Sequence, residues 1–261
     1  MIQVFSFSDM KNYIHQLYKK FIRPFLKSHM SQQRVKLVLW DVFSYFKLFG
    51  LHNMTFSKKF SIVWKCILTD WNVPHAHKPI EIIPILIEIS ERKGNGMEVF
   101  VEAGCWLGGS TIKFSLLCEA FNYPLHVFDS FAGVEFNAES SEEESRFFGE
   151  YVGPLDQVRN NVKTFGCLEV CTFHKGWFED TMREVQFPVR LAYIDCDLSK
   201  GTKEVLSVVV PNLSKDGIVY TQDYQITSLR KMLHETSTWT NLNLPVPTVN
   251  HIARNLATLK F

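Results

Sequence analysis

The chain has 261 residues, 46% of them hydrophobic and 21% charged, which is typical of a globular protein with one substantial core and excludes a disordered chain. Its net charge is only +1, but residues 1–60 hold ten Lys and Arg against two Asp, a net charge of +8 that leaves −7 for the rest. The acidic remainder argues against a nucleic-acid partner, and the basic segment is typical of a solvated helical face or of peripheral contact with an anionic membrane surface.

The six cysteines form no CxxC pair and no zinc-ligand spacing, which favours a reducing compartment. Cys105, Cys118 and Cys196 fall within apolar strand or helix patterns, where a free thiol behaves as a small hydrophobe. No secretory signal pattern is recognisable, and no run of about 18 apolar residues occurs. We therefore expect a cytoplasmic protein.

Residues 9 to about 70 are expected to form helices. A first apolar stripe recurs every four residues, and a second amphipathic stretch covers residues 35–49. We interpret residues 1–79 as an N-terminal helical extension that packs as a lid or as a homodimer contact. The two stripes are Tyr13, Leu17, Phe21 and Phe25, and then Val38, Val42, Tyr45, Phe46 and Phe49.

From residue 80 onward, a helix at 80–93 leads into alternating strands and helices, which is typical of a parallel α/β sheet. An acidic insert at residues 135–150 is expected to be a mobile loop near the ligand edge whose acids stay solvated. We predict strands at 98–104, 125–130, 171–176, 189–195 and 218–223, and helices at 110–121, 155–165, 202–213 and 228–236.

The segment 99–111 is the most informative part of the chain, because an apolar strand runs into a glycine-rich turn and then into a helix. Glycines at this place let the backbone turn tightly and approach a ligand. The next helix N-terminus, with Ser110 and Thr111, offers free N–H groups to an anion. Either an ordinary strand–helix corner or a nucleotide-type cofactor site fits this turn.

A second strand, 125–130, ends in Asp129, which sits where an acid can bind both ribose hydroxyls. The glycine pattern is GxxxGG rather than GxGxxG, so a pyrophosphate cradle is disfavoured. An adenosine with a short amino-acid tail fits better than a dinucleotide, which also disfavours an NAD-linked oxidoreductase.

Carboxylates stand at or beside the ends of four of the five predicted strands. Ligands in open α/β sheets bind beyond those carboxyl ends, so this edge is expected to carry the function. Trp177 and Phe178 can form an apolar wall for an adenine ring. Asp195, Asp197 and Asp223 can supply the oxygen ligands that a divalent cation such as Mg2+ prefers.

The chain from about Val73 to Tyr224 resembles the macrocin O-methyltransferase-like enzymes, in the order and spacing of VEAGCWLGGST, FDSF, FHKGWFEDT, YIDCDLSKGT and VYTQDY. These are class I S-adenosylmethionine-dependent methyltransferases that modify sugar hydroxyls. The resemblance implies a Rossmann-like, mostly parallel seven-stranded sheet with helices on both faces and an antiparallel last strand. It places the methyltransferase domain at residues 80–261.

The resemblance also implies a cofactor site for S-adenosylmethionine. The methionine part would lie against the first strand end and the glycine turn, the ribose on Asp129, and the adenine among residues that follow the second and third strands. The implied residues are Glu102, Ala103, Gly104, Gly108, Gly109, Ser110, Thr111, Asp129, Ser130, Phe131, Gly176, Trp177, Phe178, Asp180 and Asp195.

The same resemblance places a metal at Asp195 and Asp223. The family usually carries two adjacent acids before the tyrosine, whereas this chain has Gln222 and Asp223, so the expected Mg2+ site loses one charge. We predict that Asp195 and Asp223 hold the metal on a sugar hydroxyl, and that Asp197 or His251 removes its proton. The alternatives are a non-catalytic module that binds S-adenosylmethionine or a glycan, and a methyltransferase of a non-sugar small molecule.

Overall fold

A computed structural model describes residues 41–261 of the chain. The chain divides between Ser44 and Tyr45, and residues 45–261 form one compact unit. The first predicted apolar stripe, from Tyr13 to Phe25, lies outside the described residues. Of the second, residues 41–44 are helical and Tyr45–Gly50 form a 3-10 helix, η3, in which Tyr45 is buried.

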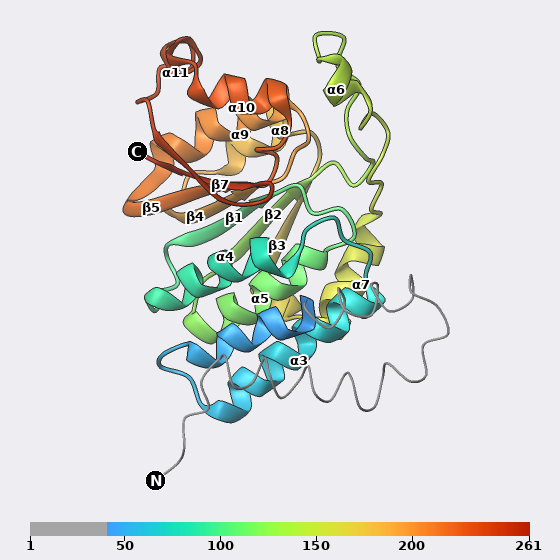
Figure 1. Ribbon diagram of the computed structural model, residues 1–261, viewed down its shortest axis with the longest axis vertical. Helices are drawn as coiled ribbons and strands as arrows, with labels where there is room; N and C mark the ends of the chain where they lie inside the picture. The colour runs from blue at the N-terminus through green and yellow to red at the C-terminus, as the bar shows by residue number, and fades with distance from the viewer. Residues whose placement is uncertain (1–40) are drawn as a thin grey trace, which may run out of the picture. The chain divides into compact units, whose positions relative to one another are not determined.

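Within the described residues, seven strands form one sheet in the order β3-β2-β1-β4-β5-β7-β6 (Figure 1). Strands β1 to β5 pair in parallel, and β7 runs antiparallel to both of its neighbours. This confirms the predicted mostly parallel sheet. The strands are β1 (Val99–Ala103), β2 (Leu125–Asp129), β3 (Cys171–Lys175), β4 (Val189–Ile194), β5 (Leu213–Thr221), β6 (Thr248–Ala253) and β7 (Leu256–Lys260).

The central strands are mostly apolar and are buried along their whole length, because helices cover both of their faces. Every residue of β1 and of β4 is buried, and the two strands pair from Val99 with Val189 to Ala103 with Ile194. Strand β5 begins at Leu213, five residues earlier than the pattern predicted, and its first half is exposed or half-buried. The residues after Leu213, from Ser214 to Gly217, include no apolar side chain and so carry no periodic signal, which explains the difference.

Helices α4 and α5 lie on one face of the sheet and α8, α9 and α10 on the other (Figure 1). Helix α3 packs against α5, and α7 also contacts α5. The chain changes face after β3, so strand order reverses between β1 and β4, where open α/β sheets bind their ligands. The helices are α3 (Phe56–Asn72), α4 (Pro79–Glu91), α5 (Gly109–Phe121), α6 (Glu142–Ser145), α7 (Leu155–Phe165), α8 (Phe178–Thr181), α9 (Ser199–Val209), α10 (Thr227–His234) and α11 (Thr236–Asn241).

Short 3-10 segments fill the remaining connections: η4 (Leu168–Val170), η5 (Met182–Glu184) and η6 (Val210–Asn212). Helix α5 begins and ends at residues in the left-handed region, Gly108 at φ 83° and Asn122 at φ 61°. Such caps fix both ends of the helix that carries the predicted anion site. Among the helices of residues 41–261, none is long and apolar enough to cross a membrane.

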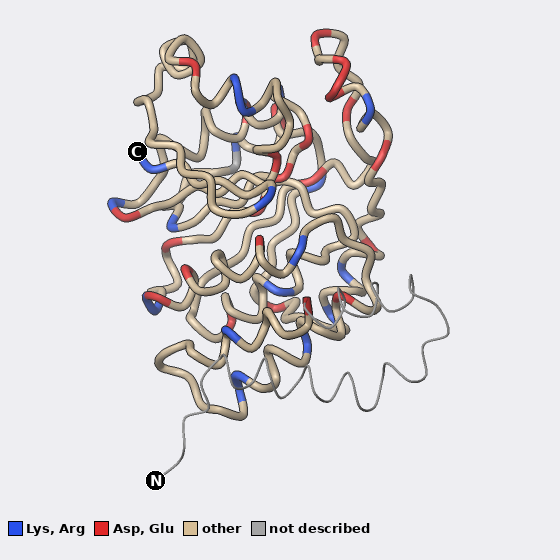
Figure 2. The backbone as a smooth tube through the Cα atoms, viewed as in Figure 1, with Lys and Arg blue, Asp and Glu red and all other residues tan. Residues whose placement is uncertain are grey.

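The acids of the insert at residues 135–150 were expected to be solvated, and Figure 2 shows charged residues along the segment that carries α6. The structure shows that not all of them are solvated. Glu144 is buried, and its carboxylate accepts the backbone N–H of Ser199 at 2.6 Å. Burial raises the pKa of Glu144, but hydrogen bonds from Ser199 and Ser141 outweigh it and lower the pKa overall. Glu143 accepts the N–H of Thr227 at 2.9 Å. The insert is therefore tied to the first turns of α9 and α10.

Candidate cofactor and acceptor site

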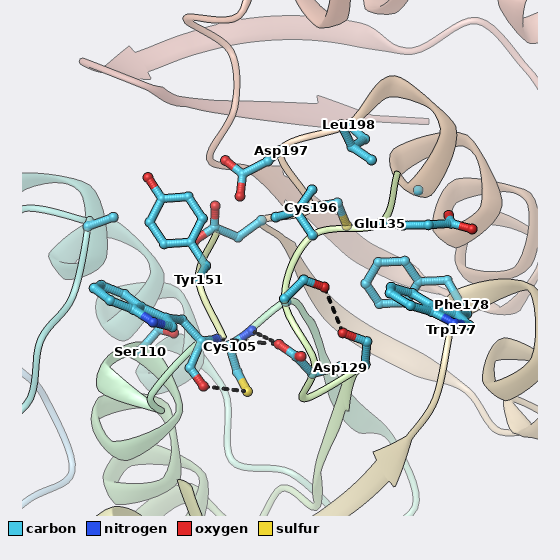
Figure 3. Close-up of a pocket in the computed structure, with 18 of the residues that line it drawn as sticks. Cys105, Ser110, Asp129, Glu135, Tyr151, Trp177, Phe178, Cys196, Asp197 and Leu198 are labelled. Atoms are coloured by element: carbon cyan, nitrogen blue, oxygen red, sulfur yellow. Dashed lines mark hydrogen bonds between the residues drawn. The ribbon is translucent and has the colours of Figure 1, made fainter. Parts of the chain in front are cut away.

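The carboxyl ends of β1 to β4 border one pocket, to which the loop before α4 and the loop after β2 also contribute. Figure 3 shows Cys105, Asp129, Trp177 and Asp197 around it. Residues distant in sequence thus meet at the predicted edge. The sequence-predicted residues that line the pocket are Gly104, Gly109, Ser110, Asp129, Ser130, Gly176, Trp177, Phe178, Asp195 and Asp197.

Gly104 occupies the point at which the backbones of β1 and β4 come closest. Its φ of 87° is one that side-chain-bearing residues rarely adopt, and a Cβ atom there would lie 1.9 Å from the carbonyl oxygen of Asp195. Only glycine fits such a position. The glycine turn predicted as a place of close approach is therefore required by the packing of the two strands themselves.

Asp129 ties the glycine turn to the end of β2. Its Oδ2 accepts the backbone N–H groups of Cys105 at 2.7 Å and Trp106 at 3.3 Å, and its Oδ1 accepts the N–H of Phe131 at 2.7 Å. Burial raises the pKa of Asp129, and these backbone hydrogen bonds oppose that rise. Its Oδ1 accepts only one of these bonds, which leaves acceptor capacity beside the pocket.

Glu102 lies beneath the pocket rather than in its wall. The side chain is completely buried, Ser110 donates a 2.5 Å hydrogen bond to its Oε1, and its Oε2 has no hydrogen-bond partner within residues 41–261. Burial raises the pKa of Glu102 to about 8, and the hydrogen bond from Ser110 opposes that rise. Any effect of Glu102 on the predicted cofactor would therefore be indirect, through Ser110 in the first turn of α5.

Three carboxylates gather between β4 and β5: oxygen atoms of Asp195, Asp197 and Asp223 all lie within 4.8 Å of one another. Asp223 is buried, and its Oδ2 accepts the N–H groups of Cys196 and Asp197 at 2.9 Å each. Tyr193 donates a 3.2 Å hydrogen bond to Asp195. Asp223 therefore shapes the loop that holds the other two carboxylates.

Burial is the largest cause that raises the pKa of each member of this trio. It raises the pKa of Asp223 to about 6, and burial together with the charge of Asp223 raises the pKa values of Asp195 and Asp197 further. Three neighbouring anions repel one another in a poorly hydrated place. Such a group favours either a bound cation or proton uptake near neutral pH.

The predicted metal set is brought together in part. Asp195 and Asp223 are neighbours as predicted, and Asp197, predicted as a base, joins them. Gln222 is buried, and its Oε1 has no hydrogen-bond partner among the residues that the structure describes. This orphaned oxygen is compatible with the predicted role of a neutral ligand.

Nine predicted residues do not line the pocket. His251 on β6 is exposed, with its Nε2 2.7 Å from the carbonyl oxygen of Arg254 and its ring stacked on Tyr224. Asp180 is exposed on α8, whereas Phe131 is buried. The residues outside the lining are Glu102, Ala103, Gly108, Thr111, Phe131, Asp180, Gln222, Asp223 and His251.

Sequence patterns did not single out an aromatic corner made by Trp106 and Tyr151, whose rings meet edge-on at 5.2 Å. Both residues have positive φ, and Tyr151 is drawn beside Asp197 in Figure 3. A Cβ atom at Gly153 would lie 2.0 Å from the carbonyl oxygen of Trp106, so this glycine lets the two loops touch. Glycines at 149 and 153 on either side of Tyr151 were the available signal.

Comparisons with known proteins agree with this geometry. The sequence model of the macrocin-O-methyltransferase (TylF) family matches residues 90–255, more than half of the chain. An 8-demethyl-8-(2,3-dimethoxy-alpha-L-rhamnosyl)-tetracenomycin-C 4'-O-methyltransferase from Streptomyces olivaceus is 36% identical over 147 residues, 52% of this chain and 56% of that protein. A mycinamicin III 3''-O-methyltransferase from Micromonospora griseorubida is 30% identical over 149 residues, 52% of this chain and 58% of that protein.

Solved structures share the fold. The O-methyltransferase NovP superimposes with a TM-score of 0.62 at 20% identity, covering 87% of this chain and 98% of that one. The calicheamicin methyltransferase CalS11 has a TM-score of 0.54 at 14% identity, covering 92% and 96%. The chain spans about half the length of the curated relatives it matches. The family match, which covers residues 90–255, shows that the chain belongs to the macrocin-O-methyltransferase (TylF) family.

Proposed function

We propose that this protein is an S-adenosylmethionine-dependent O-methyltransferase that acts on a hydroxyl group of a sugar or of a glycosylated metabolite. The observation that carries the proposal is the trio Asp195, Asp197 and Asp223 beside a pocket that also contains Asp129. Family membership supports it, as do two relatives named as O-methyltransferases of a rhamnosyl-tetracenomycin and of mycinamicin III.

The pocket fits the cofactor in its polar and apolar parts. Asp129 would hold the ribose, since one of its oxygen atoms keeps acceptor capacity. Trp177 and Phe178 would cover the adenine, and Gly104 lines the same pocket next to Asp195. When bound, S-adenosylmethionine supplies a methyl group on a positively charged sulfur.

The carboxylates would receive the proton of the acceptor hydroxyl. A proton acceptor must lie within reach of the hydroxyl group that it deprotonates. Burial raises the pKa of Asp197 well above its ordinary value, and Asp197 also lines the pocket, whereas His251 does not. We therefore favour Asp197 over His251 as the proton acceptor. Trp106 and Tyr151 would hold the apolar face of a sugar ring against it.

The donor set also fits Mg2+, which prefers carboxylate oxygens. Asp195 and Asp223 would hold the ion, with Asp197 beside them as the base, and Gln222 would add a neutral oxygen. When bound, Mg2+ supplies positive charge that lowers the pKa of a coordinated hydroxyl. Without the ion, the carboxylates would still orient the acceptor, because Tyr193 holds Asp195 and two backbone N–H groups hold Asp223.

Transfer of a labelled methyl group tests the proposal. The protein is incubated with methyl-labelled S-adenosylmethionine and with pairs of glycosides and their sugar-free counterparts. We expect label on the glycoside alone, and its loss in Asp195→Ala and Asp223→Ala but not in the exposed control Glu139→Gln. Equal labelling of the sugar-free compounds would mean that the methyl group is not transferred to the sugar but to another acceptor group. Binding of S-adenosylmethionine without any methyl transfer would mean that the protein is a non-catalytic binding module.

Three further features stay proposals. The six cysteines, all free, support a cytoplasmic location. Residues 1–79 are proposed as the extension or lid and residues 80–261 as the methyltransferase domain. The strong positive charge of the first 60 residues supports a peripheral contact with an anionic surface, and a homodimer contact through the same segment is the other proposal.

A further inference from the structure

A lysine is completely buried beside the pocket, in the second turn of α5. The Nζ atom of Lys113 lies 2.5 Å from Oδ1 of Asp70 and 2.7 Å from Nε2 of His77. Tyr45 donates a 2.9 Å hydrogen bond to the other oxygen of Asp70. An isolated buried ammonium is strongly disfavoured, so this cluster is held together by its internal pairing.

The cluster could be read as a metal site, because atoms of Asp70, His75 and His77 lie within 4.8 Å of one another. The ammonium of Lys113, however, already lies within bonding distance of two of these three groups. The positive charge that the cluster accommodates is therefore that of the lysine. His75 lies 3.3 Å from Asp70 through Nε2 and 2.8 Å from the carbonyl oxygen of Val73 through Nδ1.

The contact with Lys113 dictates where His77 carries its proton. An ammonium group has three donors and no acceptor, so Nε2 of His77 must be the acceptor. The proton of the neutral ring then resides on Nδ1. Burial, followed by the charges of Lys113 and His75, lowers the pKa of His77 well below its ordinary value, which keeps the ring neutral.

His77 also borders the pocket at the N-terminus of α5. His77 is one of the residues that line the pocket although it is only 4% exposed, and its Nδ1 has no hydrogen-bond partner among the described residues. A Cβ atom at Gly109 would lie 3.6 Å from Cε1 of His77 and 2.8 Å from Cβ of His75. The ring is thus pressed against the first helical turn, where backbone N–H groups lack intrahelical partners.

We infer that Lys113 positions His77 as a fixed Nδ1–H donor for the carboxylate of the amino-acid tail of the cofactor. The inference rests on the proposed function for the identity of that ligand. His77 is the binding residue and Lys113 acts through it. The free N–H groups of α5 and the neutral imidazole donor together form a site for a carboxylate. Both kinds of donor are uncharged, so neither changes the charge balance of the cluster of Asp70, His77 and Lys113.

The proton position can be tested without any cofactor. Nitrogen-15 NMR of the histidine rings, with the His77 signals assigned by their loss in His77→Asn, distinguishes the two neutral tautomers and the charged ring. We expect the neutral Nδ1–H form of His77 throughout the range from about pH 6 to about pH 8. A neutral ring protonated on Nε2, or a charged ring at neutral pH, would overturn the inference.

Calorimetry tests the ligand. S-adenosylhomocysteine carries the amino-acid tail, whereas 5'-methylthioadenosine lacks it. We expect His77→Phe to weaken S-adenosylhomocysteine about tenfold or more and to leave methylthioadenosine unchanged, since a hydrogen bond to a charged group is lost. His77→Asn, which keeps a donor near the Nδ1 position, should lose only about threefold. Equal weakening of both ligands in His77→Phe would mean a structural role and would refute the inference.

A paired variant tests the positioning role of Lys113. Lys113→Met combined with Asp70→Asn removes both charges together, so that neither is left buried alone. We expect the NMR spectrum of His77 to show a tautomer mixture and the affinity for S-adenosylhomocysteine alone to fall. An unchanged Nδ1–H form would overturn the role of Lys113. If the wild-type protein binds neither nucleoside, the proposed function fails, and the NMR result then shows whether the lysine–histidine pairing still holds.

Discussion

The hydroxyl of Ser110 donates a 2.5 Å hydrogen bond to the fully buried carboxyl group of Glu102, joining the first turn of α5 to the end of β1. The other carboxyl oxygen has no partner in the described part of the chain. A carboxyl group in such surroundings favours its neutral, protonated form, as the raised pKa of about 8 shows. Glu102 is therefore a source of pH-dependent stability.

Replacing Glu102 by Gln removes this titration and keeps the oxygen that accepts from Ser110. Because the folded-state pKa is raised, the stabilising contribution is fully present below the unfolded pKa of the side chain and is lost as pH rises through about 8. We expect the free energy of unfolding of the wild type to fall relative to Glu102→Gln by a few kcal/mol between about pH 5 and about pH 9. Urea unfolding of both proteins across this range measures it, and parallel curves would contradict the prediction.

Gly104 and Gly149 form a matched pair, because both have positive φ but only Gly104 is crowded. An alanine at 104 would meet the carbonyl oxygen of Asp195, whereas nothing lies within 4 Å of a Cβ atom at 149. We expect Gly149→Ala to cost about 1 kcal/mol through backbone strain alone, and Gly104→Ala about 3 kcal/mol or more. Chemical unfolding compares them, and similar losses would show that the contact with β4 can relax.

Binding of Mg2+ should be visible as stabilisation of the folded protein. Asp195, Asp197 and Asp223 repel one another, so an ion that binds them raises the melting temperature by a few degrees once its concentration exceeds Kd about tenfold. The shift should vanish with EDTA and in the double variant Asp195→Asn, Asp223→Asn. It should persist in the exposed control Glu139→Gln. An equal shift in all three proteins would place the ion elsewhere.

Asp129→Asn should weaken the binding of the cofactor through its adenosine part. The carboxylate of Asp129 accepts hydrogen bonds from the backbone N–H groups of Cys105 and Trp106. In the Asp129→Asn variant one of the two oxygen atoms is replaced by an NH2 group, which cannot accept such a bond, so the turn at Cys105 loses a hydrogen bond that stabilises it. We expect S-adenosylhomocysteine and methylthioadenosine to weaken by a similar factor of about tenfold. Calorimetry with Asp156→Asn as the exposed control measures this. A loss of affinity confined to S-adenosylhomocysteine would contradict a contact between Asp129 and the ribose, because both ligands contain that ribose.

The sequence predicted the order of elements well where the pattern is strong. The strands predicted at 98–104 and 125–130 and the helix predicted at 110–121 are all present, each to within one residue at either end. The paired end-strand acids Asp195 and Asp223 followed from the same logic, because parallel strands bring their carboxyl ends to one edge. Burial of Glu144 was missed, since its acidic surroundings resemble a solvated loop.

The chain by itself thus determined the α/β architecture, the glycine turn and the acids at the sheet edge, because hydrophobic periodicity and turn chemistry act over a few residues. Only the tertiary structure decided that His251 stays outside the pocket and that Lys113 lies against His77. These relations depend on loop paths and on contacts across 36 positions of sequence, to which no local periodicity responds.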